Sequence, residues 1–220
     1  MNSKLKNKDN NYINIANTAI ILAGGKSSRM GFDKQFLEIN NNRLIDSLVK
    51  KLKNEFEEII VVTNKTEQYV EKDYKIISDE IKDCGPLGGI HVGLKNSNSK
   101  YTYFIACDMP NINLDYIKFM KSKIEKLELD ACITKSKNGK IEPFNGFYSK
   151  KVIDVIEKQV LEKKLAISYL IDNVNAVYID EKDAKYYNDS LNMFINLNTQ
   201  KELETYTENL KKLRKGEFDD

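Results

Sequence analysis

The chain has 220 residues, enough for one large domain, and 41% of them are hydrophobic, so it can bury a substantial core. Its 35 basic and 33 acidic residues nearly cancel, which gives no electrostatic argument for a nucleic acid or an anionic membrane as partner. The cysteines are odd in number and include no C-x-x-C pair, so the sequence indicates neither a zinc site nor a disulfide framework.

Both ends of the sequence are more polar than its middle. Residues 1–16 are rich in Asn and Lys and have no apolar stretch of signal-peptide length, so we expect a polar, disordered extension there. A single domain is predicted over residues 17–214, followed by a frayed tail over 215–220. No apolar run approaches the roughly 18 residues of a membrane-spanning helix. The expected location is the cytoplasm.

Short apolar strands alternate with segments of helical periodicity. Strands are predicted at 18–23, 58–64, 74–79, 101–108, 130–135, 144–149 and 175–180. Helices are predicted at 44–56, 87–96, 114–127, 150–162, 165–172 and 199–213. Strands that alternate with helices pair in parallel through right-handed crossovers. The predicted fold is therefore α/β, a Rossmann-like three-layer αβα sandwich with a mostly parallel sheet.

Glycines and polar residues follow four of the predicted strands. Gly24 and Gly25 follow the first, Asn64 ends the second, Asp79 ends the third and Asp108 ends the fourth. In open α/β sheets, ligands bind outside the carboxyl ends of the strands. The sequence therefore predicts a binding site at this edge of the sheet.

The loop after the first strand resembles a P-loop at first sight, because Gly25 is followed by Lys and Ser. The first glycine of a P-loop would fall at Ile20, inside the strand, so that motif is absent. Adjacent glycines still let the backbone approach a ligand closely, and Arg29 and Lys34 can hold a triphosphate. An ordinary glycine turn with solvated basic residues is the alternative interpretation.

The complete pattern around this loop is more specific than the glycines alone. L-A-G-G-x-S-x-R-M-G-x-D-K fixes ten residues over thirteen positions. It resembles the signature of the molybdenum cofactor guanylyltransferase family. Further matches follow in order, namely V-V-T-N, S-D before C-G-P-L-G-G-I, A-C-D-M-P and I-N-L-N-T, so the resemblance covers about residues 18–205. L-A-G-G with C-D-M-P favours the guanylyl branch over cytidylyl relatives.

This resemblance implies a Rossmann-like nucleotidyltransferase that joins GTP to the phosphate of molybdenum-molybdopterin, giving molybdopterin guanine dinucleotide and pyrophosphate. It implies Mg²⁺ on Asp108 and catalytic roles for Arg29, Lys34 and Asp108. It also implies cofactor-delivery proteins or molybdoenzymes as partners. The nucleotide-binding residues that it implies are Leu22, Ala23, Gly24, Gly25, Lys34, Asn64, Asp79 and Asp108.

The sequence departs from the family pattern at two places. Gln200 stands where the family often has proline, and residues 136–150 match only through E-P-x-x-G-x-Y. The second segment would face the pterin in this family. Contacts to the second substrate are therefore the least specified part of the resemblance, and Asn196 and Asn198 are its candidates.

Each candidate residue also has an ordinary structural interpretation. Asp108 is a possible helix N-cap, and Asp79 a turn residue. Asn198 precedes Thr199, which forms a capping box with Glu202. His91 is more simply explained as a helix-face residue than as a general base, since a phosphate monoester is already ionised near neutral pH.

Three other functions remain open at this point. One is a related nucleotidyltransferase that uses CTP or a sugar-phosphate acceptor, and another is a non-catalytic nucleotide- or cofactor-binding protein. The third, a Rossmann-like module for an NAD-type cofactor, is disfavoured because G-x-G-x-x-G is absent.

Overall fold

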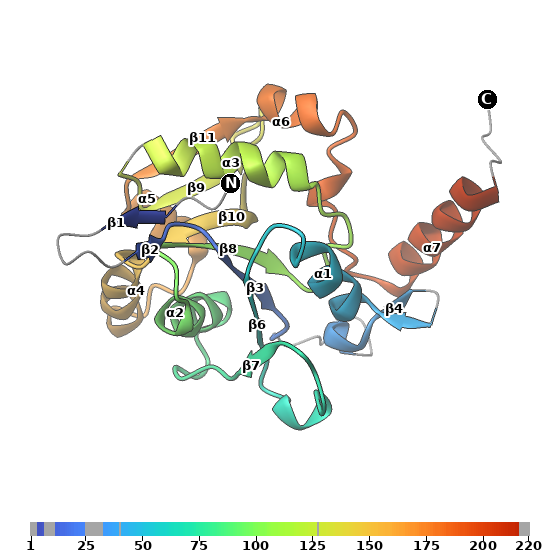
Figure 1. Ribbon diagram of the computed structural model, residues 1–220, viewed down its shortest axis with the longest axis horizontal. Coiled ribbons are helices and arrows are strands. Elements are labelled where there is room, and N and C mark those ends of the chain that lie inside the picture. The colour runs from blue at the N-terminus through green and yellow to red at the C-terminus, as the bar shows by residue number, and fades with distance from the viewer. Residues whose placement is uncertain (1–3, 7–11, 25–32, 40, 127, 216–220) are drawn as a thin grey trace.

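Strand β3 (Thr18–Leu22) lies in the middle of the molecule and is buried on both faces. Ala19 and Ile21 belong to one hydrophobic cluster, whereas Ile20 and Leu22 belong to another. This division follows from the two-residue period of a strand, which sends successive side chains to opposite faces. The computed structural model describes residues 4–6, 12–24, 33–39, 41–126 and 128–215 (Figure 1).

A seven-stranded sheet contains β3, in the spatial order β11-β9-β10-β8-β3-β6-β7. Strand β10 runs antiparallel to its neighbours β8 and β9, and the other pairs in the sheet are parallel. The predicted mostly parallel sheet is confirmed. Besides β3, its strands are β6 (Glu58–Val62), β7 (Lys75–Ile77), β8 (Tyr101–Ala106), β9 (Ala131–Lys135), β10 (Ile141–Ser149) and β11 (Ala176–Asp180).

Helices cover both faces of this sheet, which confirms the predicted three-layer sandwich (Figure 1). One core contains apolar side chains of α1 (Leu44–Leu52), α3 (Leu114–Lys126) and α6 (Glu181–Tyr187). The other contains those of α2 (Pro86–Asn96), α4 (Val152–Leu161) and α5 (Ile167–Asp172). Helix α7 (Gln200–Lys215) extends away from the body of the molecule.

Several short elements were not predicted. Strands β4 (Glu38–Ile39) and β5 (Asn42–Arg43) form a hairpin, and single 3-10 turns lie at Lys34–Phe36, Thr66–Gln68 and Asn192–Phe194. Helix α6 was also missed, because Ala184 is its one buried residue and no apolar periodicity marks it.

The structure describes parts of both ends of the chain. Within residues 1–16, which were expected to be a disordered extension, strands β1 (Lys4–Lys6) and β2 (Tyr12–Asn14) pair antiparallel. Ile15 and Ala16 are buried in the core, and the Tyr101 amide donates to the Ile15 carbonyl at 2.8 Å. At the other end, α7 includes Lys215, and residues 216–220 lie outside the described part of the chain.

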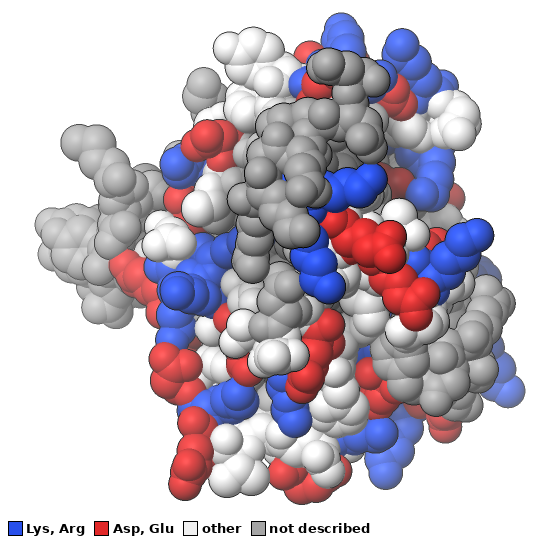
Figure 2. Space-filling model, turned by 90° about the vertical axis from the view of Figure 1, so that its right-hand side faces the viewer, with Lys and Arg blue, Asp and Glu red and all other residues white. Residues whose placement is uncertain are grey.

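Acidic and basic side chains are interspersed over the face of the molecule seen in Figure 2. This mixture agrees with the nearly balanced charge of the whole sequence. Among the helices that the structure describes, none has the length and apolarity needed to cross a membrane.

Candidate active site

The register of the parallel strands brings their carboxyl ends to a common edge of the sheet. Leu22 pairs with Val62 on one side and with Ala106 on the other, and Val62 pairs in turn with Ile77. The Ala23 amide donates to the Val62 carbonyl at 2.8 Å and continues the ladder into the following loop. The segments that follow four separate strands therefore meet at the edge where the sequence predicted a site.

A cavity of about 640 Å³ opens at this edge. It contains eight of the candidate residues predicted from the sequence, whereas Gly25 and Arg29 lie outside the described residues and Asn198 is not part of the wall. The residues that line the cavity are Leu22, Ala23, Gly24, Asp33, Lys34, Gln35, Val62, Asn64, Lys65, Asp79, Asp83, Gly85, Pro86, Gly89, Ala106, Cys107, Asp108, Phe144 and Asn196.

Lys34 connects the segment that follows β8 with the segment before α7. Its Nζ donates to Asp108 Oδ2 at 2.6 Å and to Asn198 Oδ1 at 2.6 Å. The Lys34 side chain is 25% exposed and that of Asp108 is 10% exposed, so the ion pair is partly shielded from water. A cation and a carboxylate held together at a cavity wall can bind a phosphate and a metal ion side by side.

The segment before α7 is attached to the end of β8 by its backbone. The Leu197 amide donates to the Asp108 carbonyl at 2.9 Å, and the Leu197 side chain is buried in the core. The neighbouring side chains lie on the other side of the segment, where Asn196 lines the cavity and Asn198 contacts Lys34. The alternation in I-N-L-N-T therefore separates a core anchor from two polar groups at the site.

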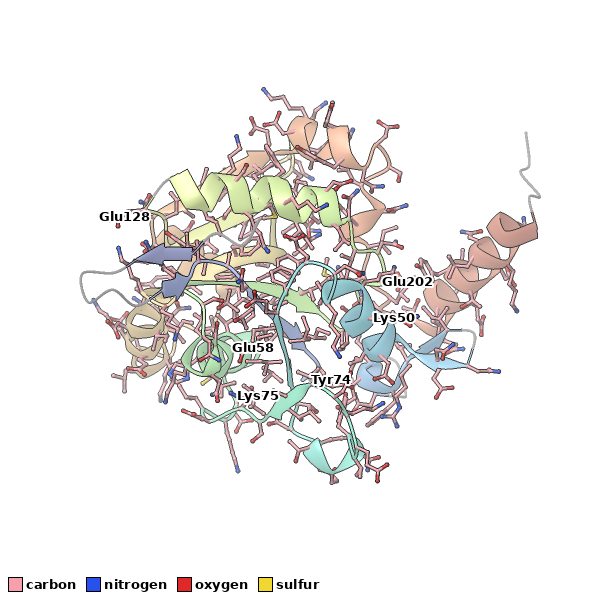
Figure 3. All side chains as sticks on the ribbon, viewed as in Figure 1. Lys50, Glu58, Tyr74, Lys75, Glu128 and Glu202 are labelled. Atoms are coloured by element: carbon pink, nitrogen blue, oxygen red, sulfur yellow. The ribbon has the colours of Figure 1, made fainter. Side chains whose placement is uncertain are left out.

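A capping box fixes the beginning of α7, as predicted. The Glu202 amide donates to Thr199 Oγ1 at 3.1 Å, and Glu202 Oε2 accepts from the Thr199 amide at 2.8 Å. The same oxygen accepts from the Asn198 amide at 2.6 Å. Glu202 is labelled in Figure 3 at the end of α7 that meets the body. The box thus holds the backbone of Asn198 beside Lys34.

Asp79 and Asn64 form a second polar group in the cavity wall. Asn64 Nδ2 donates to Asp79 Oδ2 at 3.2 Å. Burial raises the pKa of Asp79, and the hydrogen bond from Asn64 opposes this effect in part. Asp79 Oδ1 is buried without a hydrogen-bond partner among the described residues. A buried carboxylate oxygen with this accepting capacity suits a ligand that carries N–H or O–H donors.

Glycines let helix α2 approach this carboxylate. A Cβ atom at Gly89 would lie 2.8 Å from Leu22 Cδ2 and 3.7 Å from Asp79 Oδ1, and one at Gly88 would lie 2.8 Å from the Ile81 carbonyl oxygen. At Gly88 the obstacle is backbone, so a larger residue there would force α2 away from the segment that follows β7. The G-P-L-G-G segment therefore has a packing reason that also shapes the cavity.

Asp108 fits a divalent metal ion. Its Oδ1 is buried and has no hydrogen-bond partner among the described residues. Within those residues, no group of three or more His, Cys, Asp or Glu side chains could enclose a metal. Mg²⁺ commonly binds through one or two carboxylates and keeps waters and substrate phosphates as its remaining ligands. An open site with one carboxylate matches that pattern.

The cavity wall also contains residues that were not predicted to lie there. Asp33 and Gln35 flank Lys34, Lys65 follows Asn64, and Phe144 comes from β10. Asp33 belongs to the loop signature, so the pattern could have identified it, but Gln35 and Lys65 carry no signal in a single sequence. His91 lies on α2 outside the cavity wall, and its Nε2 is 2.9 Å from Glu157 Oε1.

Comparisons with known proteins agree with this geometry. The profile of the family described as "MobA-like NTP transferase domain" matches residues 19–174. A probable molybdenum cofactor guanylyltransferase of Peptoclostridium acidaminophilum is 48% identical over 196 residues, which cover 87% of this chain and 88% of that protein. A molybdenum cofactor guanylyltransferase of Syntrophotalea carbinolica is 46% identical over 189 residues, which cover 86% and 90%.

A solved structure has the same fold. Molybdopterin-guanine dinucleotide biosynthesis protein A of Archaeoglobus fulgidus superposes with a TM-score of 0.78 at 24% sequence identity, over 89% of this chain and 99% of that one. The family profile spans most of the chain, and the relatives match it over nearly their full length. The chain that carries this cavity at the carboxyl ends of its strands thus belongs to the MobA-like NTP transferase family and is a nucleotidyltransferase.

Proposed function

We propose that the protein transfers GMP from GTP to the phosphate of molybdenum-molybdopterin, forming molybdopterin guanine dinucleotide and pyrophosphate. Relatives at 46% and 48% identity are named molybdenum cofactor guanylyltransferases, and they align with this chain over most of its length. The observation that carries the proposal is the cluster of Lys34, Asp108 and Asn198, of which Lys34 and Asp108 line a cavity of nucleotide size.

The nucleotide would lie across the ends of β3, β6 and β7. The cavity is lined by Leu22, Ala23 and Gly24 after β3 and by the Asn64–Asp79 pair after β6 and β7. A carboxylate can accept from the N–H groups of guanine or from ribose hydroxyls, which fits the buried Asp79 Oδ1. The nucleotide-binding role of Gly25 and the catalytic role of Arg29 at the triphosphate stay predictions, because both residues lie outside the described part of the chain.

The reaction needs alignment and charge neutralisation more than proton transfer. The acceptor phosphate is already ionised near neutral pH and can attack the α-phosphorus in line with the departing pyrophosphate. Lys34 would place its ammonium between the two anions and stabilise the charge that develops on the transferred group. Asn196 and Asn198, in the segment before α7, would orient the acceptor.

Nucleotidyltransferases generally use a divalent metal, and we propose Mg²⁺ for this protein with Asp108 as its protein ligand. When bound, Mg²⁺ supplies a Lewis acid that neutralises charge on the phosphate oxygens. Asp108 would hold it through the buried Oδ1, while Oδ2 keeps its hydrogen bond with Lys34. We also propose the cytoplasm as its location, since Cys84, Cys107 and Cys132 are buried free thiols.

The direct test is pyrophosphate release from GTP, CTP and ATP in separate reactions with molybdenum-molybdopterin and Mg²⁺. We expect GTP to react much faster than CTP or ATP, with release that depends on both the pterin and the metal. Equal turnover of CTP and GTP would remove the guanylyl assignment. Nucleotide binding without pyrophosphate release would favour the non-catalytic alternative. Release with a sugar phosphate but not with the pterin would show that the acceptor is a sugar phosphate.

Replacing Asp79 by Asn should weaken nucleotide binding while raising the stability of the protein without ligand. We expect the affinity for GTP to fall about tenfold to a hundredfold, as for the loss of a hydrogen bond to a charged group. Isothermal titration calorimetry of GTP binding measures this effect. Asp73→Asn, a change at an exposed carboxylate paired with Lys53, is the control that should leave GTP binding unchanged.

The Asp79→Asn variant should also be more stable than the wild type at neutral pH without ligand. Because the folded pKa of Asp79 is raised, ionising it costs stability as the pH rises from its unfolded pKa through its folded pKa. The neutral amide of the variant avoids that cost, so its higher melting temperature should disappear in acid, where Asp79 of the wild type is protonated. A variant that binds GTP normally, or is less stable at pH 7, would contradict this role.

A further inference from the structure

The residues on either side of Lys34 form a closed ring of hydrogen bonds with the residues that follow β6. Gln35 Nε2 donates to Asp33 Oδ2 at 2.6 Å, and Thr63 Oγ1 donates to Gln35 Oε1 at 2.6 Å. The Lys65 amide donates to Thr63 Oγ1 at 3.1 Å, and Lys65 Nζ lies 2.9 Å from Asp33 Oδ2. These four residues therefore tie the segment 33–35 to the segment 63–65.

The amide of Gln35 is matched to its surroundings on both sides. An ionised Asp33 only accepts hydrogen bonds, so it requires the Nε2 side of the amide. Burial alone would raise the pKa of Asp33, but hydrogen bonds from Lys65 and Gln35 outweigh it and hold that pKa below its usual value. The Oε1 side faces the hydroxyls of Thr63 and of Tyr69, the latter at 3.2 Å. Burial raises the pKa of Tyr69, so its hydroxyl stays protonated well above neutral pH.

The ring leaves little freedom to the backbone of Lys34. Asp33 caps the 3-10 turn at Lys34–Phe36 by accepting from the Gln35 amide at 3.2 Å, and the Leu37 amide donates to the Lys34 carbonyl at 3.2 Å. Gln35 is only 4% exposed, and its partner Thr63 is 1% exposed. Side chains with satisfied hydrogen bonds in a dry environment are held more rigidly than solvated ones.

We propose that Gln35 is a positioning residue, whose hydrogen-bond ring fixes Lys34 relative to the end of β6 so that its ammonium meets Asp108 and the substrate phosphates. The ring connects the two halves of the cavity, because Lys34 belongs to the phosphate side and Asn64, next to Thr63, belongs to the nucleoside side. Gln35 thus links the segment that would bind the nucleoside to the position of the Lys34 ammonium group, which would bind phosphate. This inference rests on the proposed role of Lys34.

The test uses Gln35→Leu, which keeps the size of the side chain and removes its polar atoms, and Thr63→Val, which opens the ring from the other side. We expect kcat for pyrophosphate release to fall about tenfold to a hundredfold in Gln35→Leu, since a displacement of about 1 Å at a reacting group costs about that much. KM for GTP should change less than kcat. The double variant should be no worse than Gln35→Leu alone, because both changes break one ring.

A second readout does not depend on activity. Acetic anhydride acylates lysines according to their accessibility, and mass spectrometry reports the extent at Lys34 relative to Lys53 of the surface pair Lys53–Asp73. Lys34 should be acylated several-fold more in Gln35→Leu and in Thr63→Val than in the wild type, because the ring no longer aims it at Asp108. If Gln35→Leu fails to fold, Thr63→Val gives the same comparison.

Gln159→Leu is the matched control. Gln159 is 1% exposed, lies on α4 outside the cavity wall, and donates to the carbonyls of Lys164 and Ala166. It should lower stability without changing kcat or the acylation of Lys34. The proposal is overturned if Lys34 is acylated equally in wild type and both ring variants, or if kcat falls as much in Gln159→Leu. If the wild type did not turn over GTP, the proposed function would be refuted. The acylation data would still show whether the hydrogen-bond ring positions Lys34.

Discussion

Asp108→Asn is expected to release pyrophosphate at least about a thousandfold more slowly than the wild type. A metal ion contributes several kcal/mol to the stabilisation of charge on transferring phosphates, and about 1.4 kcal/mol corresponds to a factor of ten in rate. An amide oxygen is a weaker metal ligand than a carboxylate, so the variant should also need more Mg²⁺ for half-maximal activity. Steady-state rates over a range of Mg²⁺ concentrations measure both effects.

The change is nearly isosteric and should preserve the fold. The backbone carbonyl of residue 108 still accepts from Leu197, and the amide oxygen can still accept from Lys34. Asp115→Asn, at a carboxylate that is 77% exposed on α3, controls for the loss of one negative charge. If Asp108→Asn retained its rate and its Mg²⁺ requirement, Asp108 would not be the metal ligand.

Lys34→Met is expected to lower kcat about a hundredfold to a thousandfold, the usual loss when one preorganised donor to a developing charge is removed. Methionine keeps the length and the apolar stem of lysine and removes only its charge and its donors. The Mg²⁺ requirement should not increase, because Lys34 and the metal compete for the charge of Asp108. The two active-site variants should therefore differ in the direction of their metal dependence.

Lys53→Met removes a lysine from a surface ion pair with Asp73 and should leave the rate unchanged. Lys34→Arg is a second informative variant. A planar guanidinium cannot reproduce the compact contacts to both Asp108 Oδ2 and Asn198 Oδ1, so we expect little recovery of the rate. Full activity in Lys34→Met would mean that other groups neutralise the phosphates.

The sheet could be predicted from the sequence because its strands are buried on both faces. Runs such as T-A-I-I-L and E-I-I-V-V are typical of strands that are buried on both faces in a three-layer fold. The ends of the predicted strands lie within three residues of the observed ones. The order of the strands and the antiparallel β10 could not be predicted, since pairing depends on contacts between distant segments.

The sequence was sufficient to predict most residues of the candidate site, but not the contacts between their side chains. The rule that ligands bind at the carboxyl ends of parallel strands brought Gly24, Asn64, Asp79 and Asp108 together, and the cavity contains all four. The contact of Lys34 with Asn198 was not foreseen, because nothing in a single sequence relates two residues so far apart. Gln35 was missed for the same reason, since Thr63 and Tyr69, which donate to its Oε1, come after β6.

The contacts of Lys34 also have a consequence for the order of events during synthesis. Asp108 follows Lys34 by 74 residues along the chain, and Asn198 follows it by 164 residues. At about 5–20 residues per second, a ribosome needs roughly 10 to 30 s to pass from the first of these positions to the last. The residues of the nucleoside side are thus synthesised well before Asn198. The contact between Lys34 and Asn198 can form only after most of the chain has left the ribosome, so it is among the last parts of the site to be completed.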